Sequence, residues 1–376
     1  SKAALGQPSS AATALRMDAF SGVSLYEAEE LVLTAGAGTP LAQVEALLDE
    51  HNQELAFEPP NLCRLLGRDL EDGFGTLGGL VASNLAGPRR IKAGAVRDHF
   101  LGFRAVSGRG EAFKSGGRVF KNVSGYDLSK LMAGSWGTLG VLHEVTFKVL
   151  PRAEKSRTVL LIGADAADGT QAMTAALNSP YEVSAAAWLP QGLAGKSDVD
   201  ILTLAKGDVT AVRVEGPAPS IAYRCKMLRK LLGEFGQVEE LHTKNSGLFW
   251  REVRDVLPFC HDGDDRVVWK ISTAPTMGPV LLDRLSNLKR VEGYLDWGGG
   301  LVWLAVDAPN VGAEGLVRDA VAEVGGHATL IRGSEELRRS VPVFQPPAPG
   351  VAALSRRLRE QFDPHGILNP GRIDGA

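Results

Sequence analysis

The chain has 376 residues, which is enough for two or three domains, each with its own core. Apolar residues make up 44% and charged residues 23%, as in ordinary globular proteins, and a formal net charge of −3 gives no reason to expect a nucleic-acid partner. No apolar run approaches the roughly 20 residues of a membrane helix, and we expect no secretory leader. Three cysteines, odd in number and far apart, favour a reducing, cytoplasmic compartment and exclude an internal four-cysteine iron–sulfur cluster.

Short strands and glycine-rich turns are predicted for the first part of the chain. Residues 31–34 predict a strand, and Thr39-Pro40 predicts the start of a helix because a capping hydroxyl precedes a proline in the first helical position. Residues 141–150 place their side chains on two faces with a period of two until Pro151, which predicts a strand.

A separate α+β unit is predicted from about residue 155 to residue 332, because β-like and helix-like runs alternate there. Residues 342–350 have the composition of a linker, and a last helix is expected to end at Asp363-Pro364. The predicted strands are 158–162, 201–204, 267–271, 301–306 and 328–331, and the predicted helices are 167–177, 221–232, 280–288 and 311–324.

Two glycine loops share one pattern: residues 75–80 read GTLGGL and residues 137–142 read GTLGVL. Backbone N–H groups of such loops form nests for phosphate oxygens, so a matched pair suggests two walls around one extended anionic ligand. Each copy alone also fits a plain tight turn. Neither copy has the spacing of the dinucleotide fingerprint or of a P-loop, so we predict a nucleotide cofactor that is held in another way.

Several segments resemble the FAD-linked oxidases of the vanillyl-alcohol-oxidase type, namely FGTLGGLVASNLAGPRR (74–90), GGRVFKNVSGYDLSKLMAGSWGTLGVLHEVTFKVLPRAE (116–154) and FDPHGILNPGRI (362–373). LFWREVRDVLPF (248–259) and YLDWGGGLVWL (294–304) are similar to the FAD-binding E subunits of bacterial glycolate oxidase (glycolate dehydrogenase).

The resemblance implies an α+β fold of three parts. Residues 1–153 would be a two-subdomain FAD-binding domain, 154–335 an α+β cap domain, and 336–376 a linker and C-terminal segment that returns to the FAD domain. In this family an earlier phosphate loop precedes the stretch that starts here at Ser1, so we expect a domain truncated at its N-terminus, with any covalent flavin anchor upstream.

The cofactor residues that the resemblance implies fall on both glycine loops and on the C-terminal tail. The first wall would line the FAD pyrophosphate and comprises Thr76, Leu77, Gly78 and Gly79. The opposite wall comprises Gly134, Ser135, Gly137, Thr138, Gly140 and Val141. The residues beside the first loop would be Asn84 and Gly87, and the residue near the flavin ring would be Asn369.

The resemblance further implies a complex that converts glycolate to glyoxylate. Because this chain has no cluster-binding cysteines, it would pass electrons to an iron–sulfur subunit beside a catalytic flavoprotein sister subunit, in the cytoplasm or peripherally on the inner membrane. Two alternatives stay open: a structural subunit without turnover, favoured by the lack of a paired-histidine metal motif, and a free-standing oxidase of another 2-hydroxy acid.

Catalytic residues are not assigned from the sequence, although some side chains invite two interpretations. His143 and Glu144 could face the flavin or form a structural hydrogen-bonded pair. The loop 121–127 holds Lys121, Asn122, Tyr126 and Asp127, which could meet substrate or pack the loop against FAD, and its Asn-Val-Ser sequon is taken as coincidental.

Further candidates lie in the cap region and the tail. Ser246 is a plausible N-cap that would put Trp250 and Arg251 in the first turns of a helix, where Arg251 could bind a carboxylate or form a surface salt bridge. The run HDGDD (261–265) is interpreted as a solvated acidic turn and not as a metal site. His365 could lie toward the flavin or cap the last helix.

Overall fold

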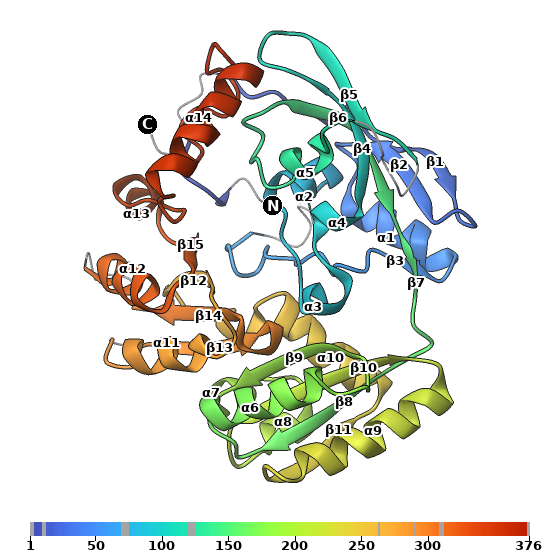
Figure 1. The fold of residues 1–376 in the computed structure, drawn as a ribbon, viewed down its shortest axis with the longest axis vertical. Coiled ribbons are helices and arrows are strands. Elements are labelled where there is room, and N and C mark those ends of the chain that lie inside the picture. Colours follow the sequence, from blue (N-terminus) through green and yellow to red (C-terminus); the bar gives the residue numbers. More distant parts are fainter. Residues whose placement is uncertain are drawn as a thin grey trace. The chain divides into compact units, whose positions relative to one another are not determined.

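The computed structural model describes residues 4–9, 13–68, 75–118, 125–261, 264–288, 290–307 and 312–373 (Figure 1). The chain divides into two compact units. The first unit comprises residues 1–86, 94–152 and 335–376, and the second comprises residues 87–93 and 153–334. The seven-residue segment 87–93 therefore leaves the first unit and joins the second, an excursion that the sequence pattern does not signal.

The first unit is built on a five-stranded antiparallel sheet with the order β1-β2-β6-β4-β5. Fully buried Leu33, Val145 and Phe147 lie in its core, where Phe147 packs against Phe57 and Phe100. The strands are β1 (Val23–Glu27), β2 (Val32–Gly36), β4 (Phe100–Val106), β5 (Ala112–Gly116) and β6 (Val141–Lys148), with a separate pair β3 (Gln53–Glu54) and β7 (Leu150–Pro151). The helices are α1 (Leu41–Glu50), α2 (Leu77–Ser83), α4 (Val96–His99) and α5 (Leu128–Met132).

The C-terminal segment folds onto this first unit through α13 (Glu335–Ser340) and α14 (Pro349–Phe362). The N–H of Gly108 donates to the carbonyl of Phe362 at 2.9 Å, and Arg338 donates to the carbonyl of Ala4 at 2.6 Å. After α14, the buried Asp363 accepts a hydrogen bond from the N–H of Leu368 at 2.7 Å, which turns the tail back on itself.

The second unit carries an eight-stranded antiparallel sheet made of two βαββαβ halves, each with the strand order of a ferredoxin-like fold. The halves meet where Trp188 of β9 pairs with Leu295 of β13. The sheet order is β11-β8-β10-β9-β13-β14-β12-β15. The elements are β8 (Lys155–Ile162), α6 (Ala166–Leu177), β9 (Val183–Leu189), β10 (Val209–Gly216), α9 (Ala218–Leu232), β11 (Gln237–Leu241), β12 (Val267–Ser272), α11 (Met277–Leu285), β13 (Glu292–Asp296), β14 (Leu301–Val306), α12 (Ala313–Val324) and β15 (His327–Arg332).

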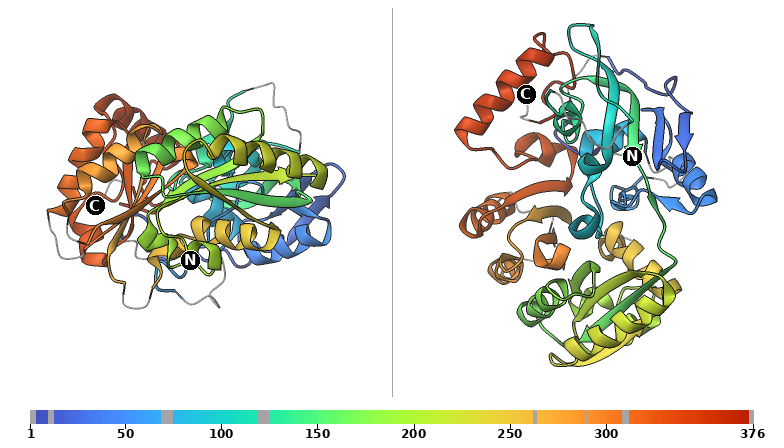
Figure 2. Two further views of the ribbon diagram at one scale, coloured as in Figure 1. Left: turned by 90° about the horizontal axis from the view of Figure 1, so that it is seen from below. Right: turned by 45° about the vertical axis from the view of Figure 1, so that its right-hand side comes forward.

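Helices cover the two faces of this sheet unequally. The helices α6, α9, α11 and α12 form a layer over one face, and Figure 2 shows α6 and α9 in green and olive against their strands. The opposite face receives α10 (Thr243–Arg254) over the first half, where the indole of Trp250 donates to Thr158 at 2.8 Å. The short helix α3 (Arg90–Ala93) also packs against β9, on the α10 side of the sheet.

Some predicted elements are wrong in detail. Residues 201–204, predicted as a strand, lie in α8 (Asp200–Thr203), because a four-residue apolar run does not distinguish a helical turn from a strand. Ser246 is not an N-cap, since α10 begins three residues earlier at Thr243 and the buried Ser246 hydroxyl meets that of Thr158 at 2.8 Å. Thr39 does not cap α1, because its hydroxyl donates to the carbonyl of Gly36 at 2.7 Å.

Candidate functional site

The second glycine loop closes the C-terminal end of α2. The N–H of Gly134 donates to the carbonyl of Val81 and that of Trp136 to the carbonyl of Ala82, both at 2.9 Å. The loop needs left-handed backbone, with φ of +83° at Gly134 and +72° at Gly137, which glycine adopts at little cost. The N–H groups of Gly137, Leu139 and Gly140 donate to no acceptor among the described residues, so this loop keeps unused backbone donors.

The first glycine loop uses its donors inside the protein. Thr76 is the N-cap of α2, and its hydroxyl oxygen accepts from the N–H of Gly79 at 3.3 Å. The N–H of Leu77 donates to the carbonyl of Thr39 at 3.1 Å, and that of Gly78 to the carbonyl of Ala37 at 2.7 Å. A Cβ on Gly78 would lie 3.0 Å from both the Cβ and the carbonyl oxygen of Ala37. This loop therefore serves close backbone packing.

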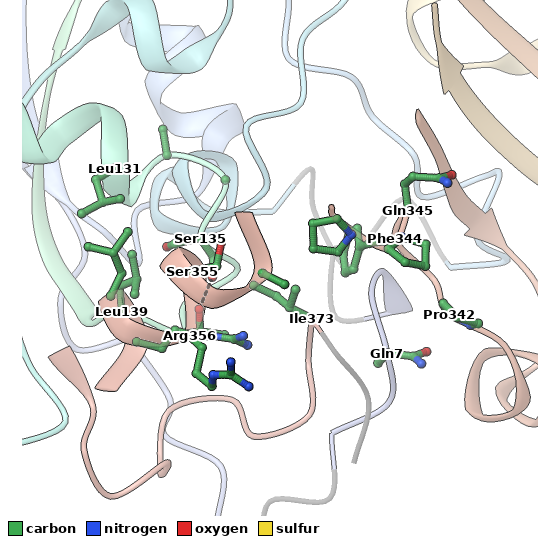
Figure 3. A pocket seen from close by; sticks show the side chains of 18 of the residues that line it. Gln7, Leu131, Ser135, Leu139, Pro342, Phe344, Gln345, Ser355, Arg356 and Ile373 are labelled. Carbon is green, nitrogen blue, oxygen red and sulfur yellow. Dashed lines mark hydrogen bonds between the residues drawn. The ribbon is translucent and has the colours of Figure 1, made fainter. Parts of the chain in front are cut away.

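A cavity of about 790 Å³ opens beside the second loop (Figure 3). Gly134, Ser135 and Thr138 line it together with residues of α13, α14 and the segment between them. Its volume is within the range of small-molecule and cofactor sites. Figure 3 shows Ser135 with Leu131 and Leu139 from the glycine-loop side, and Phe344 and Arg356 from the C-terminal segment.

Polar groups at this cavity suit an anion. The Ser135 hydroxyl forms no hydrogen bond within the described part of the chain, whereas the Thr138 hydroxyl donates to the Ser135 carbonyl at 2.7 Å. Arg356 has no ion-pair partner among the described residues, while Arg339 pairs with Glu335 at 2.6 Å. One arginine and one hydroxyl of the lining are thus available to a negatively charged ligand, and the same loop carries unused backbone N–H groups.

The other predicted cofactor residues divide between the two units. Asn84 ends α2 in the left-handed conformation, and its side-chain oxygen accepts from the N–H of Arg97 at 3.1 Å. Asn369 donates to the carbonyl of Trp136 at 2.8 Å and so fixes the tail to the second loop. Gly87 lies in the second unit, where its carbonyl accepts from the Trp297 indole at 3.0 Å.

Gly140 and Val141 continue the second loop into β6. A Cβ on Gly140 would lie 3.3 to 3.4 Å from Met132, Phe113 and the carbonyl of Val106. Val141 pairs with Val106 on β4. The structure therefore brings Gly134, Ser135, Gly137, Thr138, Gly140, Val141, Asn84 and Asn369 together around one loop.

The proposed structural His143–Glu144 pair does not form. Successive residues of a strand point to opposite faces, and the His143 ring packs against Phe20 with centroids 5.5 Å apart, while Glu144 pairs with Arg104 at 3.1 Å. In the 121–127 loop, Tyr126 is 90% exposed. Residues 121 to 124, which include Lys121, Asn122 and the sequon, lie outside the described residues.

Asp127 has a structural role at the start of α5. Its carboxylate accepts from the N–H of Lys130 at 3.3 Å and pairs with the Lys130 ammonium at 2.9 Å. Partial burial acts to raise the pKa of Asp127, but the hydrogen bonds and charge of Lys130 outweigh it and the pKa is lowered. The carboxylate is thus an N-cap and not a free acid.

Trp250 and Arg251 belong to the second unit, and His365 belongs to the first. Trp250 is buried in the second unit, with the Arg213 guanidinium 4.8 Å from its ring centroid. Arg251 is exposed and forms no ion pair within the described ranges, so the expected surface salt bridge is absent there. His365 is exposed in the tail after α14.

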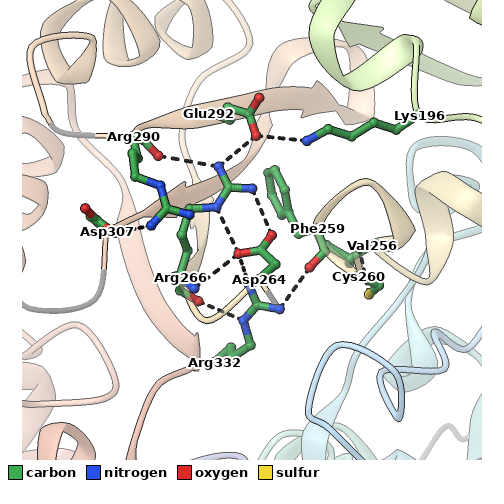
Figure 4. A network of polar contacts seen from close by, with 10 residues as sticks. All are labelled: Lys196, Val256, Phe259, Cys260, Asp264, Arg266, Arg290, Glu292, Asp307 and Arg332. Atoms are coloured by element: carbon green, nitrogen blue, oxygen red, sulfur yellow. Dashed lines mark hydrogen bonds and ion pairs between the residues drawn. The ribbon is translucent and has the colours of Figure 1, made fainter. Parts of the chain in front are cut away.

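The acidic turn is an ion-pair network (Figure 4). Asp264 binds Arg266 at 2.8 Å and Arg332 at 3.1 Å, and Arg266 also binds Glu292 at 2.7 Å. The Asp264 side chain is 8% exposed, so the prediction of a solvated turn is wrong at this position. Burial raises the pKa of Asp264, but hydrogen bonds from Arg266 and the charge of Arg332 lower it to about 2. Among the residues that the structure describes, no group of three or more His, Cys, Asp or Glu side chains could hold a metal.

Sequence reasoning missed a cationic cluster in the second unit. The Arg90 guanidinium carbon lies 4.8 Å and the Lys270 Nζ 5.0 Å from the centroid of the Trp297 ring. Lys270 is the single charged residue in the strand VVWKIS of β12. The sequence feature that could have indicated this cluster is the single lysine in an otherwise uncharged strand, because lysine is seldom buried without a partner.

Comparisons with known proteins agree with the fold. Residues 1–116 match the family model described as an FAD binding domain. The glycolate oxidase subunit GlcE of Escherichia coli is 35% identical over 374 residues, which cover 99% of this chain and 90% of that protein. GlcD of Bacillus subtilis is 24% identical and covers 79% of this chain and 68% of its own length. The structure of p-cresol methylhydroxylase superposes with a TM-score of 0.69 at 13% identity, covering 95% of this chain and 79% of that one.

The fold and the matched domain define an FAD-linked oxidoreductase of the vanillyl-alcohol-oxidase type, as the sequence predicts. Within that class, the chain belongs to the family of the glycolate oxidase subunit GlcE. The residues at the second loop fit the cofactor, because the Ser135 hydroxyl and Arg356 line the cavity as donors for an anionic pyrophosphate, and the loop's N–H groups at Gly137 and Gly140 are unused among the described residues. No helix within the described ranges is long and apolar enough to cross a membrane.

Proposed function

We propose that this chain is the FAD-binding subunit of a complex that oxidises glycolate to glyoxylate and passes the electrons to a partner subunit. The observation that carries the proposal is the cavity at the second glycine loop, with its unused donors, in a chain similar over 99% of its length to GlcE. When bound, FAD supplies the acceptor for the hydride that leaves the substrate carbon.

The first unit would hold the cofactor mainly through the second loop. The N–H groups of Gly137 and Gly140 and the Ser135 hydroxyl would bind its anionic part, and Asn369 would keep the loop in place through the Trp136 carbonyl. Thr76, Leu77, Gly78 and Gly79 would support this arrangement indirectly, because their α2 helix ends against the second loop.

The partners we propose are a catalytic flavoprotein sister subunit and an iron–sulfur subunit, in a cytoplasmic complex that can associate with the inner membrane. The name of the E. coli relative, a glycolate oxidase subunit, supports assembly into a complex. Electron balance requires an acceptor for the two electrons, and we propose an iron–sulfur subunit in that role because three dispersed cysteines, two of them buried, offer this chain no four-cysteine cluster.

A structural subunit without its own flavin is the second candidate. It is favoured by the first glycine loop, whose N–H groups at Leu77, Gly78 and Gly79 are all used within the fold. Such a subunit would keep the loops for packing alone. The two candidates differ in one measurable property, which is retention of FAD by the purified chain.

The test is a visible absorption spectrum of the full chain after incubation with FAD and removal of unbound cofactor. We expect a retained flavin band, and we expect anaerobic glycolate to bleach it when the partner subunits are present. A chain that retains no flavin, alone or in the complex, contradicts the proposal and leaves the structural candidate. A band that glycolate bleaches in the isolated chain would point to a free-standing oxidase.

A further inference from the structure

Two cations and an indole form a fixed group on one face of the second unit's sheet. Arg90 and Lys270 lie 4.8 and 5.0 Å from the Trp297 ring centroid. The indole of Trp297 is held in place because its ring N–H donates to the carbonyl of Gly87 at 3.0 Å. The backbone N–H of Trp297 donates to the Asp296 side chain at 2.7 Å. All of these residues belong to the same unit.

Neither cation forms an ion pair within the described ranges, although the charge of the buried Asp296 acts on Lys270 and raises its pKa. The side chains of Arg90 and Lys270 form no hydrogen bond or ion pair there, whereas the neighbouring Arg89 binds Glu215 with contacts of 2.6 and 2.9 Å. Burial and the nearby charge of Arg90 lower the pKa of Lys270 to about 8, so the lysine is still mostly protonated at neutral pH. Since the single charge of Asp296 does not offset burial and the charge of Arg90, a further anion would stabilise these two cations.

A histidine lies on the same face of the sheet. On β12 and β15, Lys270 pairs with Thr329 and Ser272 pairs with His327, which places His327 two residues along the strand on the Lys270 side. Burial, and then the charges of Lys270 and Arg90, lower the pKa of His327. A neutral imidazole offers one donor and one acceptor, which suits a hydroxyl beside an anionic group.

The other half of the sheet shows how this fold treats a structural cation. Arg213 of β10 lies on the same face as Thr158, with which it pairs across to β8. Its guanidinium contacts Ser184 at 3.2 Å and Glu215 at 3.5 Å, and it stacks on Trp250. Arg213 is therefore held by a hydrogen bond and an ion pair, whereas the Lys270 ammonium in the other half has neither among the described residues.

We propose that Arg90 and Lys270 bind the carboxylate of a small organic acid beside Trp297, with His327 on a hydroxyl next to that carboxylate. A guanidinium binds a carboxylate through two parallel hydrogen bonds, and an ammonium adds a point charge. Resting on the proposed function, the acid is a 2-hydroxy acid of the size of glycolate. The residues of this site all belong to the second unit.

The experiment is isothermal titration calorimetry of the full chain with glycolate, acetate and the neutral isostere glycolamide. We expect glycolate to bind more tightly than acetate, and glycolamide not to bind. Arg90→Met and Lys270→Met should each weaken glycolate binding at least tenfold, and His327→Ala should abolish the preference for glycolate over acetate. The matched control is Lys230→Met, an exposed lysine of α9 on the opposite side of the sheet, which should bind as the wild type does.

The proposal is overturned if the wild-type chain binds no acid, if glycolamide binds like glycolate, or if both methionine variants bind like the wild type. Should Lys270→Met fail to fold, Arg90→Met gives the same reading, because Arg90 is exposed on a short helix. Binding through these residues in a chain that retains no FAD keeps this site and overturns the proposed function. If glycolate reduces the bound flavin but every variant binds glycolate as the wild type does, the proposed function is kept and this site is overturned.

Discussion

The two glycine loops share the letters GTLG, but the structure uses them differently. In the first loop, the N–H groups of Leu77, Gly78 and Gly79 all donate to protein acceptors. In the second, the N–H groups of Gly137 and Gly140 donate to none of the described residues, and Gly134, Ser135 and Thr138 of the same loop line a cavity of about 790 Å³. One copy is a packing device, and the other is open to a ligand.

The difference comes from what lies next to each loop. The first copy starts a helix directly against the turn at residues 36–39, so its donors meet carbonyl oxygens. The second loop packs against the carbonyl end of α2, which accepts from the N–H groups of Gly134 and Trp136, while those of Gly137 and Gly140 donate to none of the described residues. The two loops therefore lie at the two ends of α2. A glycine motif gives the possibility of a phosphate nest, and the neighbours decide whether its donors stay free.

The largest effect expected from this comparison is on folding, at Gly78. A valine there would force its branched Cβ into Ala37, where only 3.0 Å is available, and overpacking of this kind costs about 2 to 3 kcal/mol. We expect Gly78→Val to lower the free energy of unfolding by that amount in urea denaturation. The adjacent Gly79 is the control, since a Cβ there meets only the Thr76 hydroxyl at 3.5 Å. Gly79→Ala should leave stability unchanged or raise it by up to about 1 kcal/mol, because alanine favours the helix. Equal losses in both variants would contradict the packing role.

The next effect is on the cofactor, at Gly137. An alanine Cβ would lie 2.6 Å from the Asn369 side-chain nitrogen and would have to adopt a φ of +72°. The loop must shift to relieve both, which removes the Asn369 tether and re-aims the free N–H. We expect FAD affinity, measured by fluorescence titration, to fall at least about tenfold, or roughly 1.4 kcal/mol.

Gly110 provides the control for backbone strain at Gly137. Its φ is +76°, and nothing lies within 4 Å of a Cβ placed there. Gly110→Ala should therefore lose about 1 to 2 kcal/mol of stability for the left-handed backbone and keep its FAD affinity. If Gly137→Ala binds FAD as tightly as Gly110→Ala does, the second loop is not the cofactor wall.

A smaller effect is expected at the cap of the first loop. Thr76→Ala removes the hydroxyl that accepts from the N–H of Gly79, and loss of an N-cap costs about 1 kcal/mol. Thr76→Ser keeps the oxygen and should restore most of that loss. FAD affinity should stay the same in both variants once the folded fraction is matched. A change in affinity without a change in stability would return the first loop to the cofactor site.

The sequence predicted the fold and the loop positions well, because these depend on local pattern and on a long resemblance. The strand at residues 141–150 follows from its period of two, and it appears as β6 (Val141–Lys148) followed by β7. The same letters could not show that the donors of Leu77 and Gly78 are used, since their acceptors at Thr39 and Ala37 depend on tertiary packing. Nor could they place Arg90 beside Lys270, because 180 residues separate the two in the chain.

The smallest effect separates the two hydroxyls of the second loop. The Ser135 hydroxyl lines the cavity and bonds to none of the described residues, while the Thr138 hydroxyl donates to the Ser135 carbonyl at 2.7 Å. Ser135→Ala should therefore weaken FAD binding about three- to fivefold, the worth of one neutral hydrogen bond, with unchanged stability. Thr138→Ala should instead lower the free energy of unfolding by about 1 kcal/mol, because it removes the hydroxyl hydrogen bond and leaves the Ser135 carbonyl with only the Thr138 N–H at 3.0 Å, and it should change FAD affinity less. The reverse result, with Ser135→Ala unstable and Thr138→Ala deficient in FAD, would mean that the cofactor lies on the Thr138 side of the loop, against the geometry of the cavity.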